Sequence, residues 1–240
     1  MDSQYLFELL CGGVVKGSIY ALIALGYTMV YGIIQLINFA HGEVYMIGAF
    51  VAFIVAGILT LTGYSGLTVL VLAAVVAVIY AAAYGYTLEK IAYRPLRNAP
   101  RLSPLISAIG ASIFLMNYVQ LAQTPDFLPF PELITEFEFM EPISRYLSSV
   151  DMVNLAVTTV TMVALTILIK YTRIGKAMRA TQQDMVMTRL VGINVDRVIS
   201  ATFIIGSVLA AIAGVLIASR TCQINAAIGF MAGVKAFTAA

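Results

Sequence analysis

Charged side chains are missing from four long stretches of the chain. No Asp, Glu, Lys or Arg occurs in residues 44–88, 102–125, 152–169 or 198–219. A transmembrane helix takes about 20 apolar residues, so the first stretch holds two spans and each of the others holds one. Together with the Gly, Pro and polar residues that separate them, the pattern predicts spans near residues 14–33, 44–62, 67–88, 104–122, 153–170 and 198–219.

A further apolar segment begins near residue 227 and continues to Ala240 without a polar flank. We therefore expect the 240 residues to be part of a longer polypeptide. The expected fold class is an all-α, polytopic integral membrane bundle with about seven spans or partial spans, truncated at its C-terminus. These spans are expected to form a single transmembrane domain over residues 1–240.

Three connections between the spans differ in the sign of their charge. Residues 89–101 carry four cations and one acid: Lys90, Arg94, Arg97, Arg101 and Glu89. Residues 123–151 carry six acids and one cation: Asp126, Glu132, Glu136, Glu138, Glu141, Asp151 and Arg145. Residues 170–197 are again basic, with Lys170, Arg173, Lys176, Arg179, Arg189 and Arg197 against Asp184 and Asp196.

Because cations accumulate in cytoplasmic loops, the charges predict a topology. The two basic connections are expected inside the cell, and residues 123–151 are expected to form an extracytoplasmic loop. Counting back from these loops places the N-terminus outside, although Lys16 argues weakly against this. A broken or re-entrant segment at residues 32–43 would change the parity.

The overall composition excludes several classes of protein. Hydrophobic residues make up 61% of the chain and charged residues 11%, less than half the roughly 25% that is usual in globular proteins. The net charge of +2 is small and scattered, so no nucleic-acid partner is expected. Cys11 and Cys222 are isolated, which predicts neither a disulfide framework nor a metal site. The chain has no P-loop, H-E-x-x-H or G-x-S-x-G motif, so we expect no cofactor and no ATP hydrolysis by this chain.

A polar cluster interrupts the apolar N-terminal region at Asn38, His41 and Glu43. Polar groups at membrane depth are costly and tend to face a cavity or a partner. On one regular helix Asn38, His41 and Tyr45 would share a face, and Glu43 would point away from it. Glu43 then needs a wet cavity or a cation, and Lys235 is a candidate unless unwinding near Gly42 brings His41 close. The alternative is that the cluster only anchors a turn at the membrane interface.

Cations spaced three apart and interleaved apolar residues make residues 170–191 amphipathic. Gly192 is placed to end this helix, and Asn194 or Asp196 to cap the start of the next span. By this pattern alone the helix is a membrane-surface element on the cytoplasmic side. In the outside loop, the alternation in Thr135–Phe139 predicts a half-buried strand in a small cap.

Five motifs together resemble one known family. They are GSIYALIALGYTMVYG at residues 17–32, INFAHGE at 37–43, AYRPLR at 92–97, ISAIG at 106–110 and GFMAGVKAFTAA at 229–240. The chain resembles the LivH/LivM permease family, the transmembrane subunits of bacterial ABC importers for branched-chain amino acids. The resemblance covers nearly the whole chain and is weakest in the loop 123–151.

This resemblance implies a non-catalytic permease subunit in the bacterial inner membrane, surrounded by lipid, that imports leucine, isoleucine and valine. It implies four kinds of partner: a second, LivM-like permease subunit, two cytoplasmic ATPase subunits and a periplasmic binding protein. The segment from Gly175 to Asn194 resembles the loop through which the family engages its ATPase, which replaces the membrane-surface interpretation. The candidate coupling residues are Arg173, Gly175, Lys176, Arg179, Asp184, Arg189 and Gly192, and the candidate substrate-pathway residues are Asn38, His41, Glu43 and Lys235.

Three alternatives remain open from the sequence. A permease of a related amide or urea importer would share the same motifs. In a proton-coupled secondary carrier, His41 and Glu43 would relay protons and no ATPase would be needed. An intramembrane enzyme would use His41. The basic helix with its glycine stop and the poverty of titratable groups in the spans favour the ABC permease.

Overall fold

The computed structural model describes residues 3–97, 99–100, 102–134 and 148–239. Within them, six helices are long and apolar enough to cross a membrane. They are α1 (Ser3–Ile34), α2 (His41–Leu61), α3 (Leu67–Leu88), α4 (Leu102–Ala122), α5 (Ser149–Tyr171) and α8 (Val195–Thr221). The six predicted spans are thus confirmed, and the apolar segment near residue 227 is a shorter helix, α9 (Ile228–Ala239).

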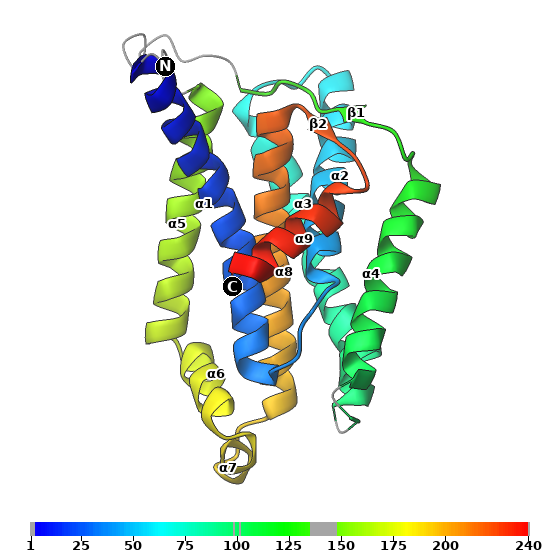
Figure 1. Cartoon of the computed structure of the whole chain (residues 1–240), viewed down its shortest axis with the longest axis vertical. Coiled ribbons are helices and arrows are strands. Elements are labelled where there is room, and N and C mark those ends of the chain that lie inside the picture. The colour runs from blue at the N-terminus through cyan, green and yellow to red at the C-terminus, as the bar shows by residue number, and fades with distance from the viewer. Residues whose placement is uncertain (1–2, 98, 101, 135–147, 240) are drawn as a thin grey trace.

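The helices α1, α2, α3 and α8 pack against one another and form the centre of the bundle. Helix α5 lies against α1 and α8 on one side, and α4 lies against α2 on the other (Figure 1). Helix α9 crosses this centre obliquely, in contact with α1 and α2, and does not run the length of the bundle.

Small residues set the close packing of α8. A Cβ atom at Gly214 would overlap the backbone carbonyl oxygen of Tyr45 in α2, so only glycine fits there. By contrast, a Cβ at Gly13 or Gly17 in α1 would meet nothing within 4 Å. Helices in lipid associate through such close contacts because apolar burial gains little there.

The two ends of the bundle differ. At one end a π-helical turn (Glu89–Tyr93) and a 3-10 turn (Arg94–Leu96) continue α3, and the short helices α6 (Arg173–Gln183) and α7 (Met185–Leu190) extend beyond the spans. At the other end β1 (Leu128–Pro129) pairs antiparallel with β2 (Gln223–Ile224). The N-terminal end of α1 lies at this second end (Figure 1), as the span count predicts.

Two sequence predictions need correction or stay untested. The amphipathic segment predicted as one helix is two, because the Asp184 side chain accepts hydrogen bonds from the backbone N–H groups of Val186 and Met187 and starts a new helix. Such side-chain capping competes with helix continuation. The predicted strand at Thr135–Phe139, and the acids Glu136, Glu138 and Glu141 with Arg145, lie outside the described residues, as does Arg101.

Candidate substrate pathway and coupling region

The chain leaves helical structure between Gln35 and Ala40, and α2 begins at His41. Asn38 therefore precedes the helix, which corrects the helical face predicted for it. The buried Asn38 Oδ1 accepts a hydrogen bond from the Tyr93 hydroxyl at 2.9 Å, and the Asn38 carbonyl accepts one from the His41 backbone N–H at 3.1 Å. The Asn38 carbonyl thus closes the break between α1 and α2, and the Asn38 side chain connects the break to the end of α3.

His41 is fully buried against α1 and α8. Its ring lies edge-on to Tyr27, with ring centroids 5.3 Å apart. A Cβ atom at Gly26 would lie 2.7 Å from the Nε2 atom, and one at Gly206 would lie 3.6 Å from Cε1. Glycine at both positions leaves the room that the imidazole occupies. Nε2 has no hydrogen-bond partner in the described part of the chain.

Glu43 points to the other side of α2, as the sequence predicts, and meets α4 and α9. Its Oε1 accepts a hydrogen bond from the Ser112 hydroxyl at 3.1 Å, and a Cβ atom at Gly229 would lie 2.6 Å from its Oε2. Oε2 is buried and has no hydrogen-bond partner among the residues that the structure describes. Because Glu43 lies in the first turn of α2, the positive end of the helix dipole faces its charge.

Lys235 does not pair with Glu43. It is exposed on α9, and its Nζ lies 5.4 Å from the ring centroid of Tyr20 on α1. The four candidate residues thus divide into a buried set of three and one exposed cation.

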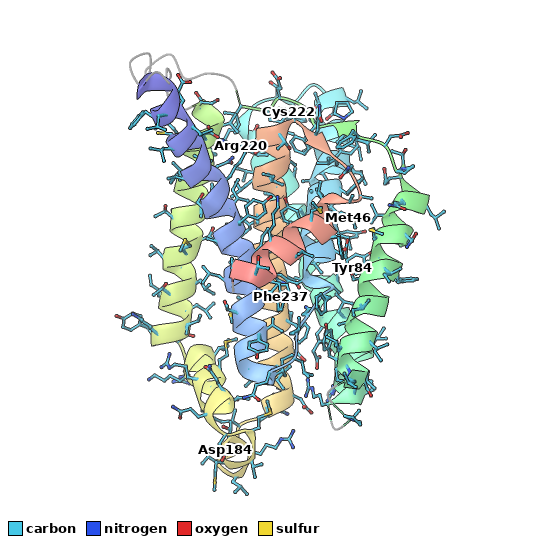
Figure 2. All side chains as sticks on the ribbon, viewed as in Figure 1. Met46, Tyr84, Asp184, Arg220, Cys222 and Phe237 are labelled. Atoms are coloured by element: carbon cyan, nitrogen blue, oxygen red, sulfur yellow. The ribbon has the colours of Figure 1, made fainter. Side chains whose placement is uncertain are left out.

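A small cavity lies beside the helix break. It holds about 250 Å³ between α1, the segment after it and α9, and its lining residues are Tyr27, Thr28, Tyr31, Ile37 and Phe237. The walls are apolar apart from three hydroxyl groups. Tyr27 is buried, and its hydroxyl has no hydrogen-bond partner within the described residues. Figure 2 shows Phe237 midway along the bundle, near the end of α9.

The predicted coupling residues gather on α6 and α7 and at their ends. Thr172 accepts a hydrogen bond from the Gly175 N–H at 3.1 Å and caps α6, and a Cβ at Gly175 would overlap the carbonyl oxygen of Ile169. Arg179 donates to the carbonyl groups of Ile169 and Lys170. These contacts fix α6 in a sharp turn below α5.

Beyond α6, the helix α7 presents an uncovered surface. Arg189 is exposed there, and the apolar side chains Val186, Met187, Leu190 and Val191 are between 61% and 75% exposed. Arg173 and Lys176 on α6 are exposed as well. We call α7, with the exposed residues just before and after it, the α7 tip. Figure 2 shows Asp184 within it, at the extreme end of the molecule.

The predicted helix stop and cap are confirmed. Gly192 ends α7 with a φ of 85°, a left-handed conformation that glycine adopts without strain. The Asn194 side chain then accepts a hydrogen bond from the Arg197 N–H at 3.1 Å and caps α8. Gly192 thus ends α7 and Asn194 starts the central helix α8 two residues later.

An ion-pair network beside this cap was not predicted from the sequence. Arg97 pairs with the fully buried Glu89 and with Asp196, in the latter case at 2.5 Å, and Arg94 pairs with Asp196 at 3.0 Å. Ser200 on α8 donates to the other carboxylate oxygen of Glu89 at 2.7 Å. The network joins the end of α3 to the start of α8. The one signal in the sequence is that Glu89 is the single acid of its basic connection.

Comparisons with known proteins agree with this arrangement. The family of permease components of branched-chain amino acid transport systems matches residues 9–240. The permease protein LivH of the high-affinity branched-chain amino acid transport system is 50% identical over 246 residues in both Salmonella typhimurium and Escherichia coli K12. The corresponding protein BraD of Pseudomonas aeruginosa is 48% identical over 243 residues. These alignments cover 100% of this chain and 80% and 79% of the relatives. No solved structure matches the chain.

The ion-pair network predicts unequal effects for two neighbouring arginines. Arg97→Met leaves the buried Glu89 carboxylate without its cation, so we expect the free energy of unfolding to fall by about 3–5 kcal/mol. Arg94→Met is the matched control, because Arg94 is 45% exposed and exposed pairs contribute at most about 1 kcal/mol. Thermal unfolding of the purified protein in detergent, followed by circular dichroism, measures both. Glu89→Gln in the Arg97→Met background should recover part of the loss, and equal losses for the two arginine variants would contradict the network.

Proposed function

Because the chain belongs to the family of permease components of branched-chain amino acid transport systems, we propose that it forms part of a translocation path for leucine, isoleucine and valine. Its partners are a second, LivM-like permease subunit, two cytoplasmic ATPase subunits and a periplasmic binding protein. The chain itself is a multi-pass membrane protein and a non-catalytic component of the ABC transport system.

The observation that carries the proposal is the uncovered α7 tip. Its four exposed apolar side chains are flanked by the exposed cations Arg173, Lys176 and Arg189. Contiguous exposed apolar surface with a polar rim is typical of a protein interface. The tip also extends beyond the ends of α1 and α8 (Figure 1), so a membrane surface level with those ends does not cover it. A cytoplasmic ATPase subunit is the partner that this position suits, which makes residues 170–197 the coupling loop.

Closure of the ATPase subunits would move the α7 tip, and the contacts around it give that motion a route. Only residues 191–194, which include Gly192 and the Asn194 cap, separate α7 from α8. Asp196, one residue inside α8, holds Arg97 of the α3 end. A displacement of the tip therefore moves α8 and the end of α3 together.

The substrate path, in this proposal, runs beside the break between α1 and α2. The cavity lined by Tyr27, Ile37 and Phe237 offers apolar walls to an aliphatic side chain. Asn38, His41 and Glu43 position the helix ends that frame it, and Lys235 is an exposed cation on the helix that carries Phe237. Transporters build such sites where helices break, since backbone groups released there can face a cavity.

Reconstituted transport tests the function. The complete transporter, with both permease subunits, both ATPase subunits and the binding protein, is placed in proteoliposomes, and uptake of radiolabelled leucine is measured. Uptake should require ATP and the binding protein and should be unaffected by an uncoupler of the proton gradient. Uptake that needs the proton gradient and persists without the ATPase subunits would instead support a secondary carrier. Uptake of urea or an amide in place of leucine would support the related importers.

Cysteine labelling tests the orientation. In a variant without Cys11 and Cys222, a cysteine at Val186 in the α7 tip should react with an impermeant maleimide only after cells are permeabilised. A cysteine at Tyr64 is the matched control. Tyr64 is similarly exposed but follows the C-terminal end of α2, at the end of the bundle opposite to the α7 tip, and a cysteine there should react in intact cells. The reverse labelling pattern would overturn both the topology and the proposed docking surface.

Substitutions at two glycines distinguish the effect of backbone strain from a loss of coupling to the ATPase. Gly192→Val and Gly63→Val place a β-branched residue at nearly equal positive φ angles, 85° and 88°, where a Cβ meets nothing within 4 Å. Both changes strain the backbone to a similar degree. We expect normal membrane levels for both, with substrate-stimulated ATPase activity lost only in Gly192→Val, which disturbs the stop of α7. Equal stimulation in the two variants would show that this helix stop takes no part in coupling.

The buried carboxylate of Glu43 gives another prediction. Glu43→Gln is nearly isosteric but removes the charge that the α2 terminus and Ser112 stabilise, so we expect the leucine uptake rate to fall about tenfold, equivalent to about 1.4 kcal/mol. Glu8→Gln, on the exposed start of α1, is the control and should leave uptake unchanged. The affinity of the binding protein for leucine should not change in either case. Wild-type rates for both Glu43→Gln and His41→Asn would reduce this segment to a simple structural turn.

A further inference from the structure

A second and larger cavity lies at the end of the bundle that carries the β1–β2 pair. It holds about 540 Å³ between α1, α5, α8 and residues 132–134, a volume typical of pockets for small molecules. Its lining includes the cations Lys16 and Arg220, the acids Glu132 and Asp151, and the apolar residues Leu133 and Val150. Figure 2 shows Arg220 and Cys222 near this end of the molecule.

The four charges are arranged in two layers. Arg220 and Asp151 form an ion pair in the wall, with Nε and Oδ1 2.5 Å apart and side chains only 13% and 15% exposed. Lys16 and Glu132 are exposed at the rim. The buried Nη1 of Arg220 has no acceptor in the part of the chain that the structure describes. An unpaired buried guanidinium donor is costly, so the site gains from a further acceptor.

We propose that this cavity binds the zwitterion of an amino acid with a branched aliphatic side chain before it is translocated. The carboxylate is held by Arg220 and Lys16, the ammonium group by Asp151 and Glu132, and the side chain lies against Leu133 and Val150. The assignment of the ligand rests on the proposed function. The end in question is the one that the acidic loop places outside the membrane, where a binding protein would deliver its amino acid.

Charge balance favours a zwitterion over other ligands. The lining described here carries two cations and two anions, so a ligand with one charge of each sign keeps the site neutral. A carboxylate alone would add a negative charge beside Asp151 and Glu132, and an amine alone would add a positive charge beside Lys16 and Arg220. Desolvating unmatched charges is expensive. An ion pair that only fastened α5 to α8 would need neither a cavity nor the further charges of Lys16 and Glu132 at its rim.

Photolabelling of the intact transporter tests the site. The probe is a leucine analogue with a diazirine in its side chain, added at millimolar concentration to the complete complex in nanodiscs without the binding protein. Mass spectrometry should find the label in residues 132–134 or 148–151. L-Leucine should displace it, whereas 4-methylpentanoate, which lacks the ammonium group, and 3-methylbutylamine, which lacks the carboxylate, should not.

Two substitutions at the rim leave the Arg220–Asp151 pair intact and so avoid loss of folding. Lys16→Gln and Glu132→Gln should each lower labelling about tenfold. Glu8→Gln, exposed near the start of α1, and Lys90→Gln, exposed at the opposite end, are the matched controls and should label like wild type. Labelling elsewhere only, labelling that leucine does not displace, or full labelling of both rim variants would overturn the proposal.

Leucine uptake by the same wild-type complex, with ATP and the binding protein added, separates this inference from the proposed function. Normal uptake without label in the cavity would refute the binding site and leave the transport function standing. Absence of ATP-dependent leucine uptake would refute the proposed function itself.

Discussion

Backbone groups inside a bilayer have no water to bond, and this constraint governs the break between α1 and α2. A lipid-exposed break would leave several N–H and C=O groups unsatisfied at a cost of several kcal/mol each. The break is instead closed by hydrogen bonds from Gln35 N–H to the Tyr31 carbonyl and from His41 N–H to the Asn38 carbonyl. The Tyr93 hydroxyl, supplied by the continuation of α3, satisfies the Asn38 side chain. The position of α3 and the existence of the break therefore depend on each other.

The same constraint explains why polar and small residues occur together. Glu43 is tolerated at the start of α2 because the helix terminus, Ser112 and the close backbone of Gly229 surround it. A Cβ atom at Gly42 would overlap the Gly229 carbonyl oxygen, so α9 can approach only this closely because both residues are glycine. Loss of that close approach would expose the carboxylate to hydrocarbon. Within the described residues, α9 thus covers a polar site.

Features carried by local sequence could be predicted, and features that depend on distant pairing could not. The spans follow from stretches without charge, and the Gly192 stop and Asn194 cap follow from the chemistry of single residues next to a helix. The split at Asp184 was missed because the amphipathic period continues through it while the side chain caps a new start. The pairing of Arg97 with Asp196 joins residues 99 positions apart, and no pattern along the chain specifies it. Lys235 was the candidate cation for Glu43, yet the oblique path of α9 turns it toward Tyr20.

Helix α8 connects the two ends of the molecule. Its 27 residues span about 40 Å at 1.5 Å per residue, and an unbroken helix is stiff along its axis. Asp196 near its first residue binds Arg97 of the α3 end, and Arg220 near its last binds Asp151 of α5. Between these anchors, glycines such as Gly206 and Gly214 let α8 lie close against α1 and α2. The proposed coupling implies that a displacement entering at the α7 tip is carried along α8 to the Arg220–Asp151 pair. In the proposed mechanism, that pair is the place where motion driven from the ATPase side changes the affinity of the outer cavity for its amino acid.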